Sequence, residues 1–343
     1  MDPLFTDSID KLFSTLASYK AIQEIELNAN STDLWATLEE SGFADILVTE
    51  EFGGAQLPWA DAYSMFELCG QYALPVPLGM TASARWLMSQ NGIDPKIVSG
   101  SITISTQSET YTDIKDLKSP FTPFGRVANW VLMNHGDSCY LLPTESANVE
   151  PTGVYASQQA HLSWQQLPSE AVKIGPTQDL RALASTVTTA MMAGAMSKVL
   201  QLVLTHANDR VQFGKPISKF QAVQQQISVL AEAVQAAAIT AQMVFAQGPT
   251  KDNLLMIAAA KARISELVPS VNATAHAVHG AMGVTEEFHL HYFTRRLNEW
   301  RLDYGSEGYW QNKLGKAYLE SDSNNALEFL INRVDPKERN LNG

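Results

Sequence analysis

The sequence predicts a mainly α-helical protein with a small β domain in the middle of the chain. Residues 177–322 carry apolar side chains at three- and four-residue spacing, as in an antiparallel four-helix bundle. Residues 99–176 instead carry short apolar runs bounded by Gly, Pro, Asn and Ser, which is typical of an antiparallel β-sheet or barrel. Residues 1–98 are expected to form an N-terminal helical domain, and residues 323–343 a polar tail.

Turn and capping residues divide the first two domains into elements. The sequence Asn30-Ser31-Thr32-Asp33 can cap a helix, and Gly42 can end it. Further helices are expected at about 59–70 and 80–90, because Gly and Pro bound both segments. In the middle domain, strands are expected at residues 102–104, 130–133 and 139–142.

Long helices dominate the C-terminal region. Their apolar faces begin at Leu180, Phe220 and Leu254, and a fourth helix is expected at 307–321. Pro269 predicts a kink in the third helix. Alanine lies on more than one side of these helices, so we expect them to face both a domain interior and another subunit.

Composition excludes several classes of protein. The chain has 24 basic and 36 acidic residues and a net charge of −12, which disfavours nucleic acid or a membrane surface as a partner. Cys69 and Cys139 are too few for a disulfide framework. The first residues do not resemble a secretory signal, and residues 182–204 contain too many polar side chains for a membrane span. We therefore expect a cytoplasmic enzyme.

Several common site motifs are absent from the sequence. It has no GxGxxG after a strand, no P-loop, no GxSxG and no HExxH. His276 and His279 share one helix face, but a metal site would need further converging ligands. The spacing favours histidines with local hydrogen bonds, and no metal site is predicted.

The segment from Asp209 to Gln221 carries the clearest chemical signal. Arg210 stands beside the turn at Gly214 and the start of a helix, an arrangement that can bind a pyrophosphate. Phe213 could cover an aromatic ring of the same ligand. The alternative is a solvated turn between two helices.

The string R-x-Q-F-G-x-P-I-x-x-F-Q at 210–221 resembles the acyl-CoA dehydrogenase superfamily. Segments at 34–54 and 278–285 resemble the family's N-terminal helical domain and its late glycine turn. The helix–β–helix order also matches the family's three-domain fold. These similarities, which occur in the family's order along the chain, make the resemblance specific.

The resemblance implies an FAD enzyme that introduces an α,β double bond into an acyl-CoA thioester. A carboxylate would remove the α-proton while the β-hydrogen leaves as hydride to the flavin, and an electron-transfer flavoprotein would accept the electrons. In the family, FAD lies across a subunit interface. The residues implied to bind it here are Arg210, Gln212, Phe213, Gln221, Gly280 and Gly283.

The sequence departs from the family pattern at the catalytic base. The two usual positions of the base fall on Tyr304 and Ala184, which are not acidic. Asp303 is the remaining candidate for the catalytic base, and Glu307 is the second candidate. We expect residues 301–306 to be strand-like, so that Asp303 and Tyr304 would point in opposite directions.

Other parts of the flavin site are also weakened. The family's late Gln falls on Ala277 and one of its glycines on Ala281, and the middle domain is shortened where the flavin ring would lie. This pattern resembles the shorter subunit of heterotetrameric bacterial members that degrade steroid side chains. In these members a longer homologous subunit carries the base.

Two alternatives remain open. The chain could be a homo-oligomeric acyl-CoA dehydrogenase that uses Asp303 or another carboxylate, or a non-enzymatic scaffold that retains the fold. The acyl group could be a steroid side chain or a fatty or branched chain, since no residue identifies it.

Overall fold

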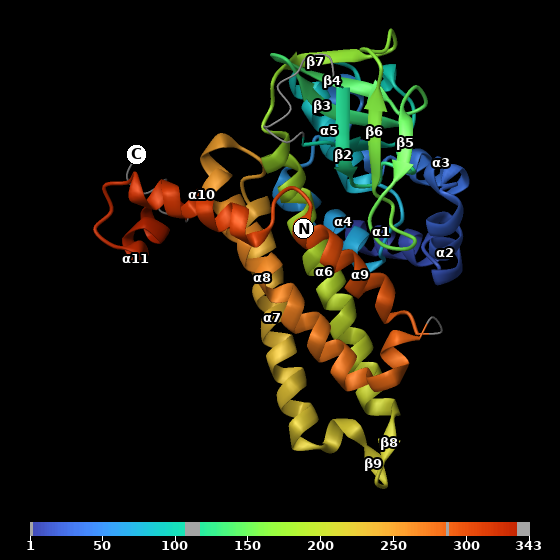
Figure 1. Ribbon diagram of the computed structural model, residues 1–343, viewed down its shortest axis with the longest axis vertical. Coiled ribbons are helices and arrows are strands. Elements are labelled where there is room, and N and C mark those ends of the chain that lie inside the picture. Colours follow the sequence, from blue (N-terminus) through green and yellow to red (C-terminus); the bar gives the residue numbers. More distant parts are fainter. Residues whose placement is uncertain (1–2, 107–116, 286–287, 335–343) are drawn as a thin grey trace. The chain divides into compact units, whose positions relative to one another are not determined.

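The computed structural model describes residues 3–106, 117–285 and 288–334 (Figure 1). The chain folds into two compact units. Residues 1–65 and 74–187 form the first unit, and residues 66–73 and 188–343 form the second. Each unit is therefore assembled from two separate stretches of the chain.

The first unit begins with helices, as expected. Its helical elements are α1 (Pro3–Leu16), α2 (Tyr19–Asn28), α3 (Thr32–Glu40), the start of α4 (Trp59–Gln71) and α5 (Leu78–Gln90). Ser31 is the N-cap residue of α3, and Gly42 follows that helix with a φ of 75°. Most of α5 is buried, and the Thr81 hydroxyl donates to the carbonyl oxygen of Ile102 at 3.1 Å, which ties α5 to the β region.

The strands of the first unit form two sheets. One has the order β1-β3-β4-β7 and consists of β1 (Ile102–Ile104), β3 (Trp130–His135), β4 (Ser138–Pro143) and β7 (Val172–Pro176). The other has the order β2-β6-β5 and consists of β2 (Leu117–Thr122), β6 (Ala160–Trp164) and β5 (Asn148–Pro151). Val131, Leu162 and Trp164 belong to one buried cluster.

The expectation of a purely antiparallel sheet is wrong for one pair of strands. β1 and β3 pair in parallel, with Ile102 opposite Trp130, whereas the other described pairs in these two sheets are antiparallel. A parallel pair needs a long connection. The segment between β1 and β3 is long enough, and it contains β2.

The second unit is helical. Its main elements are α6 (Leu180–Asp209, from Thr188 onward), α7 (Gln221–Phe245), α8 (Leu254–His279), α9 (Leu290–Leu302), α10 (Glu307–Leu319) and α11 (Ala326–Phe329). α8 packs against α7, α9 and α10. The three expected long helices and the helix at 307–319 are confirmed. α9 was not expected, and in the polar tail Phe329 and Val334 are buried.

Two glycines bring helices of the second unit into backbone contact. A Cβ atom on Gly70 of α4 would lie 1.8 Å from the carbonyl oxygen of Met191 on α6. A Cβ atom on Gly194 of α6 would lie 1.9 Å from the carbonyl oxygen of Glu67 on α4. No larger residue fits at either position, so the crossing binds residues 66–73 into the second unit.

By length and composition, two helices in the described part of the chain could cross a membrane, which differs from the expectation for residues 182–204. The apolar window of α6 is 67% buried inside the protein, as in the core helix of a globular fold. The window of α7 is only 28% buried. Val229 and Ile239 on α7 are more than half exposed, so α7 has an uncovered apolar face.

Candidate functional site

The predicted anion-binding segment forms a β-hairpin after α6. Strands β8 (Val211–Gln212) and β9 (Lys215–Pro216) pair in an antiparallel fashion. Phe213 and Gly214 form the two-residue turn with φ values of 51° and 79°, as in a type I′ hairpin. The Phe213 side chain is 93% exposed, so the turn presents its ring to the outside of the unit.

Arg210 connects this hairpin with the late glycine turn. Its guanidinium Nη1 lies 3.7 Å from the sulfur of Met282 in the 3₁₀ helix η6 (Gly280–Val284). Arg210 is exposed and forms no salt bridge with a carboxylate in the described ranges. The two segments expected to bind FAD therefore meet within one chain. Their one exposed guanidinium retains an unbalanced positive charge.

The late turn depends on two glycines in different ways. Gly280 ends α8 with a φ of 60°, and a Cβ atom there would meet no atom within 4 Å. Gly283 is buried, and a Cβ atom there would lie 2.9 Å from Cβ of His279. Gly283 is thus required for packing, whereas Gly280 leaves the backbone open to a ligand. Gln221, also predicted to bind FAD, is the exposed first residue of α7.

The histidines near this turn have local partners. Nδ1 of His279 pairs with the carbonyl oxygen of Ala275 at 2.7 Å, and Nε2 of His276 pairs with the Thr294 hydroxyl at 3.2 Å. The His279 ring stacks on His206 with 4.5 Å between centroids. Burial lowers the pKa of all three histidines. No group of ligand-type side chains in the described residues could hold a metal.

The segment expected to be strand-like differs from that expectation at its start. Arg301 and Leu302 are the last residues of α9. Asp303 is extended, with a ψ of 136°, and Tyr304 adopts a left-handed conformation, with a φ of 59°. The expectation is wrong at this point because the helical spacing of Leu290, Phe293, Leu297 and Trp300 gives α9 a buried face, and the helix continues to Leu302.

A fully buried lysine holds this segment. Nζ of Lys261 donates hydrogen bonds to the carbonyl oxygens of Trp300 at 2.8 Å, Arg301 at 3.0 Å and Gly305 at 3.1 Å. A fourth acceptor, the Ser265 hydroxyl, lies at 3.2 Å. Burial lowers the pKa of Lys261, and the charge of Asp303 opposes this shift more strongly than that of Glu307. Asp303, only 8% exposed, is thus the main negative neighbour of a buried ammonium group.

The second candidate carboxylate also has a cation beside it. Nε of Arg301 donates to Oε2 of Glu307 at 3.0 Å, and Nη2 of Arg301 contacts the other carboxylate oxygen. This pairing lowers the pKa of Glu307. The usual base positions are not acidic, and both Tyr304 and Ala184 are buried. Arg301 therefore holds Glu307 in its charged form, and Asp303 is the carboxylate whose charge acts most strongly on the buried Lys261.

Comparisons with known proteins identify a family, relatives and solved structures that this chain resembles. Residues 183–317 match the family described as "Acyl-CoA dehydrogenase, C-terminal domain". The chain is similar to acyl-CoA dehydrogenase IpdE2 of Mycolicibacterium smegmatis, with 27% identity over 300 residues, 86% of this chain and 91% of the relative.

Two solved structures share the fold. A chain of the ChsE4-ChsE5 complex from Mycobacterium tuberculosis aligns with a TM-score of 0.80 and 19% identity, covering 93% of this chain and 97% of that one. A variant of the Tcur3481-Tcur3483 steroid ACAD aligns with a TM-score of 0.79 and 20% identity, covering 92% and 96%. The predicted order of helical and β regions is thus the order of a known fold.

Proposed function

The chain belongs to the acyl-CoA dehydrogenase superfamily, and from this premise we propose that it is one subunit of a heteromeric, FAD-dependent acyl-CoA dehydrogenase. In this proposal the chain supplies the Arg210 clamp for the adenosine-pyrophosphate part of FAD. A longer homologous subunit supplies the catalytic base. The substrate is an acyl-CoA thioester.

The observation that carries the proposal is that a cation lies near each of the two carboxylates: Glu307 forms an ion pair with Arg301, and the charge of Asp303 acts on the buried Lys261. A general base must accept a proton during the reaction. Protonation of Asp303 would leave the buried Lys261 without its main counter-charge, which is costly in a dry interior. Glu307 is partly exposed and forms an ion pair with Arg301. These contacts favour structural roles for both carboxylates.

The clamp supports the binding role. Arg210 is exposed and unbalanced, Gln212 is exposed on the same hairpin, and Gly280 leaves the backbone open. These groups suit a pyrophosphate, with the 93% exposed Phe213 ring beside an aromatic part of the ligand. Gln221 and Gly283 complete the proposed set by their positions at the start of α7 and in the late turn. FAD, when bound, would supply the hydride acceptor.

The uncovered face of α7 supports a partner subunit. Val229 and Ile239 leave apolar surface in contact with water, which is typical of an interface. Two similar solved structures carry two-component names, ChsE4-ChsE5 and Tcur3481-Tcur3483. We infer a heteromer in the cytoplasm, with an electron-transfer flavoprotein as electron acceptor. The steroid ACAD among the similar structures favours a steroid-derived acyl group over a fatty or branched one.

The test is co-expression with a longer homologue that carries the missing Glu. We expect a yellow, active complex, whereas the chain alone should be colourless or poorly soluble. Arg210→Ala should remove most FAD from the complex, while Arg263→Ala, at an exposed arginine of α8 paired with Glu266, should leave FAD content unchanged. Full flavin content and turnover from the chain alone would refute the proposal.

The two alternative functions predict different results for these variants. In a homo-oligomeric enzyme that uses Asp303 as base, Asp303→Asn abolishes turnover while FAD remains bound. In a non-enzymatic scaffold, Arg210→Ala has no effect on the FAD content of any complex. Both outcomes can be measured on the same set of variants.

A further inference from the structure

The first unit contains a pocket of about 690 Å³, remote in sequence from the proposed FAD clamp. One side of α3, the segment before β1 and the turn before β3 form its wall. Its charged lining residues are Glu39, Arg85, Lys96 and Arg126. The volume lies within the range of small-molecule sites.

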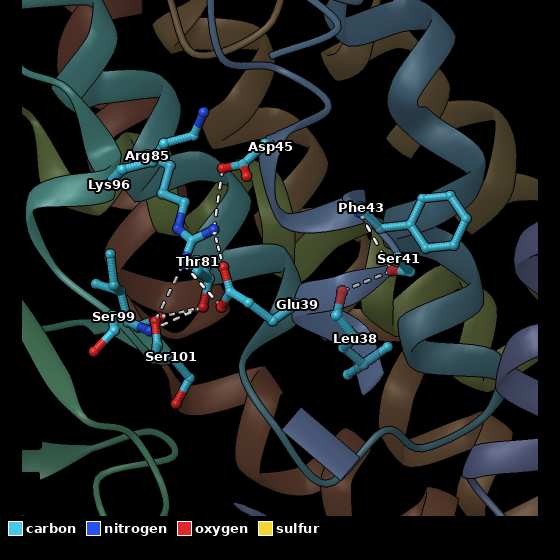
Figure 2. Close-up of polar contacts among 12 residues, drawn as sticks. Leu38, Glu39, Ser41, Phe43, Asp45, Thr81, Arg85, Lys96, Ser99 and Ser101 are labelled. Atoms are coloured by element: carbon cyan, nitrogen blue, oxygen red, sulfur yellow. Dashed lines mark hydrogen bonds and ion pairs between the residues drawn. The ribbon is translucent and has the colours of Figure 1, made fainter. Parts of the chain in front are cut away.

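Arg85 pairs with two nearby carboxylates, those of Glu39 and Asp45. It is 3% exposed, and its Nη1 lies 3.0 Å from Oδ1 of Asp45 and 2.6 Å from Oε1 of Glu39 (Figure 2). Its Nη2 donates to Oε2 of Glu39 at 3.0 Å. The buried guanidinium thus pairs with both acids, which together carry one negative charge more than Arg85 neutralises.

The other two cations of the wall are not balanced. In the part of the chain that the structure describes, the exposed ammonium group of Lys96 has no hydrogen bond or ion pair. Arg126 donates to the carbonyl oxygens of Ser157 at 2.7 Å, Glu26 at 3.0 Å and Leu27 at 3.4 Å. Carbonyl groups orient the guanidinium but carry no net charge. Three cations against two carboxylates leave one positive charge.

Other residues of the lining carry hydrogen-bond donors. Thr32 and Ser99 line the pocket, and their hydroxyl groups donate to no acceptor among the described residues. The indole Nε1 of Trp35 and Nε of Arg85 are buried in the wall, also without an acceptor in the described chain. The Trp35 ring, Val98 and Val127 add apolar surface. The pocket therefore combines an excess of donors with an apolar lining.

We propose that this pocket binds a small organic monoanion, a carboxylate on an apolar body, with its charge near Lys96 and Arg126. A single negative charge balances the one excess positive charge, and the apolar body lies along Trp35 and the two valines. This site uses none of the residues proposed to bind FAD, so it does not depend on the proposed function.

Octanoate is a suitable probe, titrated into the full-length chain by isothermal calorimetry. We expect binding at one site, no binding of octylammonium and much weaker binding of 1-octanol. Failure of octanoate to bind at millimolar concentrations would overturn the proposal. Equal affinity for octanoate and 1-octanol would also overturn it, because the unbalanced cations would then have no role.

Two variants and two controls locate the site. Ala36→Trp fills the pocket from α3 and should abolish binding, whereas Ala36→Ser should not. Lys96→Gln should weaken binding about threefold, the effect of one exposed ion pair, and Lys11→Gln on α1 should have none. Undiminished binding to Ala36→Trp would place the ligand elsewhere and refute the proposal. FAD content of the co-expressed complex should be the same in all four variants.

Discussion

Nζ of Lys261 on α8 lies 2.8 Å from the carbonyl oxygen of Trp300, in the last turn of α9. The last carbonyl groups of a helix have no partner within it, and here a lysine from another helix supplies the donors. The same ammonium group reaches Gly305 beyond the helix end. One side chain therefore fixes both the end of α9 and the turn that carries Asp303 and Tyr304.

Removal of this lysine should destabilise the fold. We expect Lys261→Met to lower the free energy of unfolding by about 3 kcal/mol, because carbonyl groups and the Asp303 carboxylate lose their buried partner. Urea denaturation measures the change. Lys316→Met, at a lysine whose side chain is 78% exposed, is the control and should change stability by less than about 0.5 kcal/mol. Equal effects of the two variants would contradict a capping role.

A structural Asp303 should be coupled to Lys261. We expect Asp303→Asn to reduce stability, and a double-mutant cycle with Lys261→Met to show a coupling of about 1–3 kcal/mol. Turnover of the co-expressed complex, measured with its acyl-CoA substrate, should persist in Asp303→Asn. Lost turnover with unchanged stability would identify Asp303 as the base.

The glycine crossing of α4 and α6 gives a sharp comparison. Gly194→Ala should lower the free energy of unfolding by about 3 kcal/mol or more, since its methyl group would overlap the Glu67 carbonyl oxygen. Gly315 of α10 has no atom within 4 Å of an added Cβ atom, so Gly315→Ala should raise stability by about 0.5–1 kcal/mol. Thermal unfolding of both variants tests this. A Gly194→Ala protein as stable as the unmodified chain would rule out the contact.

The stability of the protein should fall at acidic pH because the stacked histidines His206 and His279 become protonated. Burial lowers the pKa of His206 and His279 below about 6.5, the value in an unfolded chain. The unfolded state then binds more protons, so this contribution is complete above about pH 6.5 and is lost as the pH falls through the lower, folded-state values. We expect His279→Gln to flatten the dependence of Tm on pH between about 7 and 5. His135→Gln is the control. If the slope of Tm against pH were the same in His279→Gln, His135→Gln and the unmodified chain, the prediction would be wrong.

Sequence patterns predicted the elements better than the contacts between them. The capping residues before α3 and the helical spacing of α6 to α8 are local signals, and the structure has these helices. The same kind of signal was available for α9 but was masked by its many charged residues. Lys261 and Trp300 are 39 residues apart, and Arg85 and Glu39 are 46 apart. No periodicity identifies such pairs, because only the folded chain brings their charges and carbonyl groups together.

The second unit consists of two separate stretches of the chain, which limits how the protein can be divided into fragments. A fragment of residues 183–317, the stretch that matches the family domain, would lack residues 66–73, against which Gly194 packs. Such a fragment would expose a helix surface built for contact with another backbone, and we expect it to aggregate. Addition of a peptide that spans α4 in trans should restore its solubility. No single cut of the chain releases either unit complete.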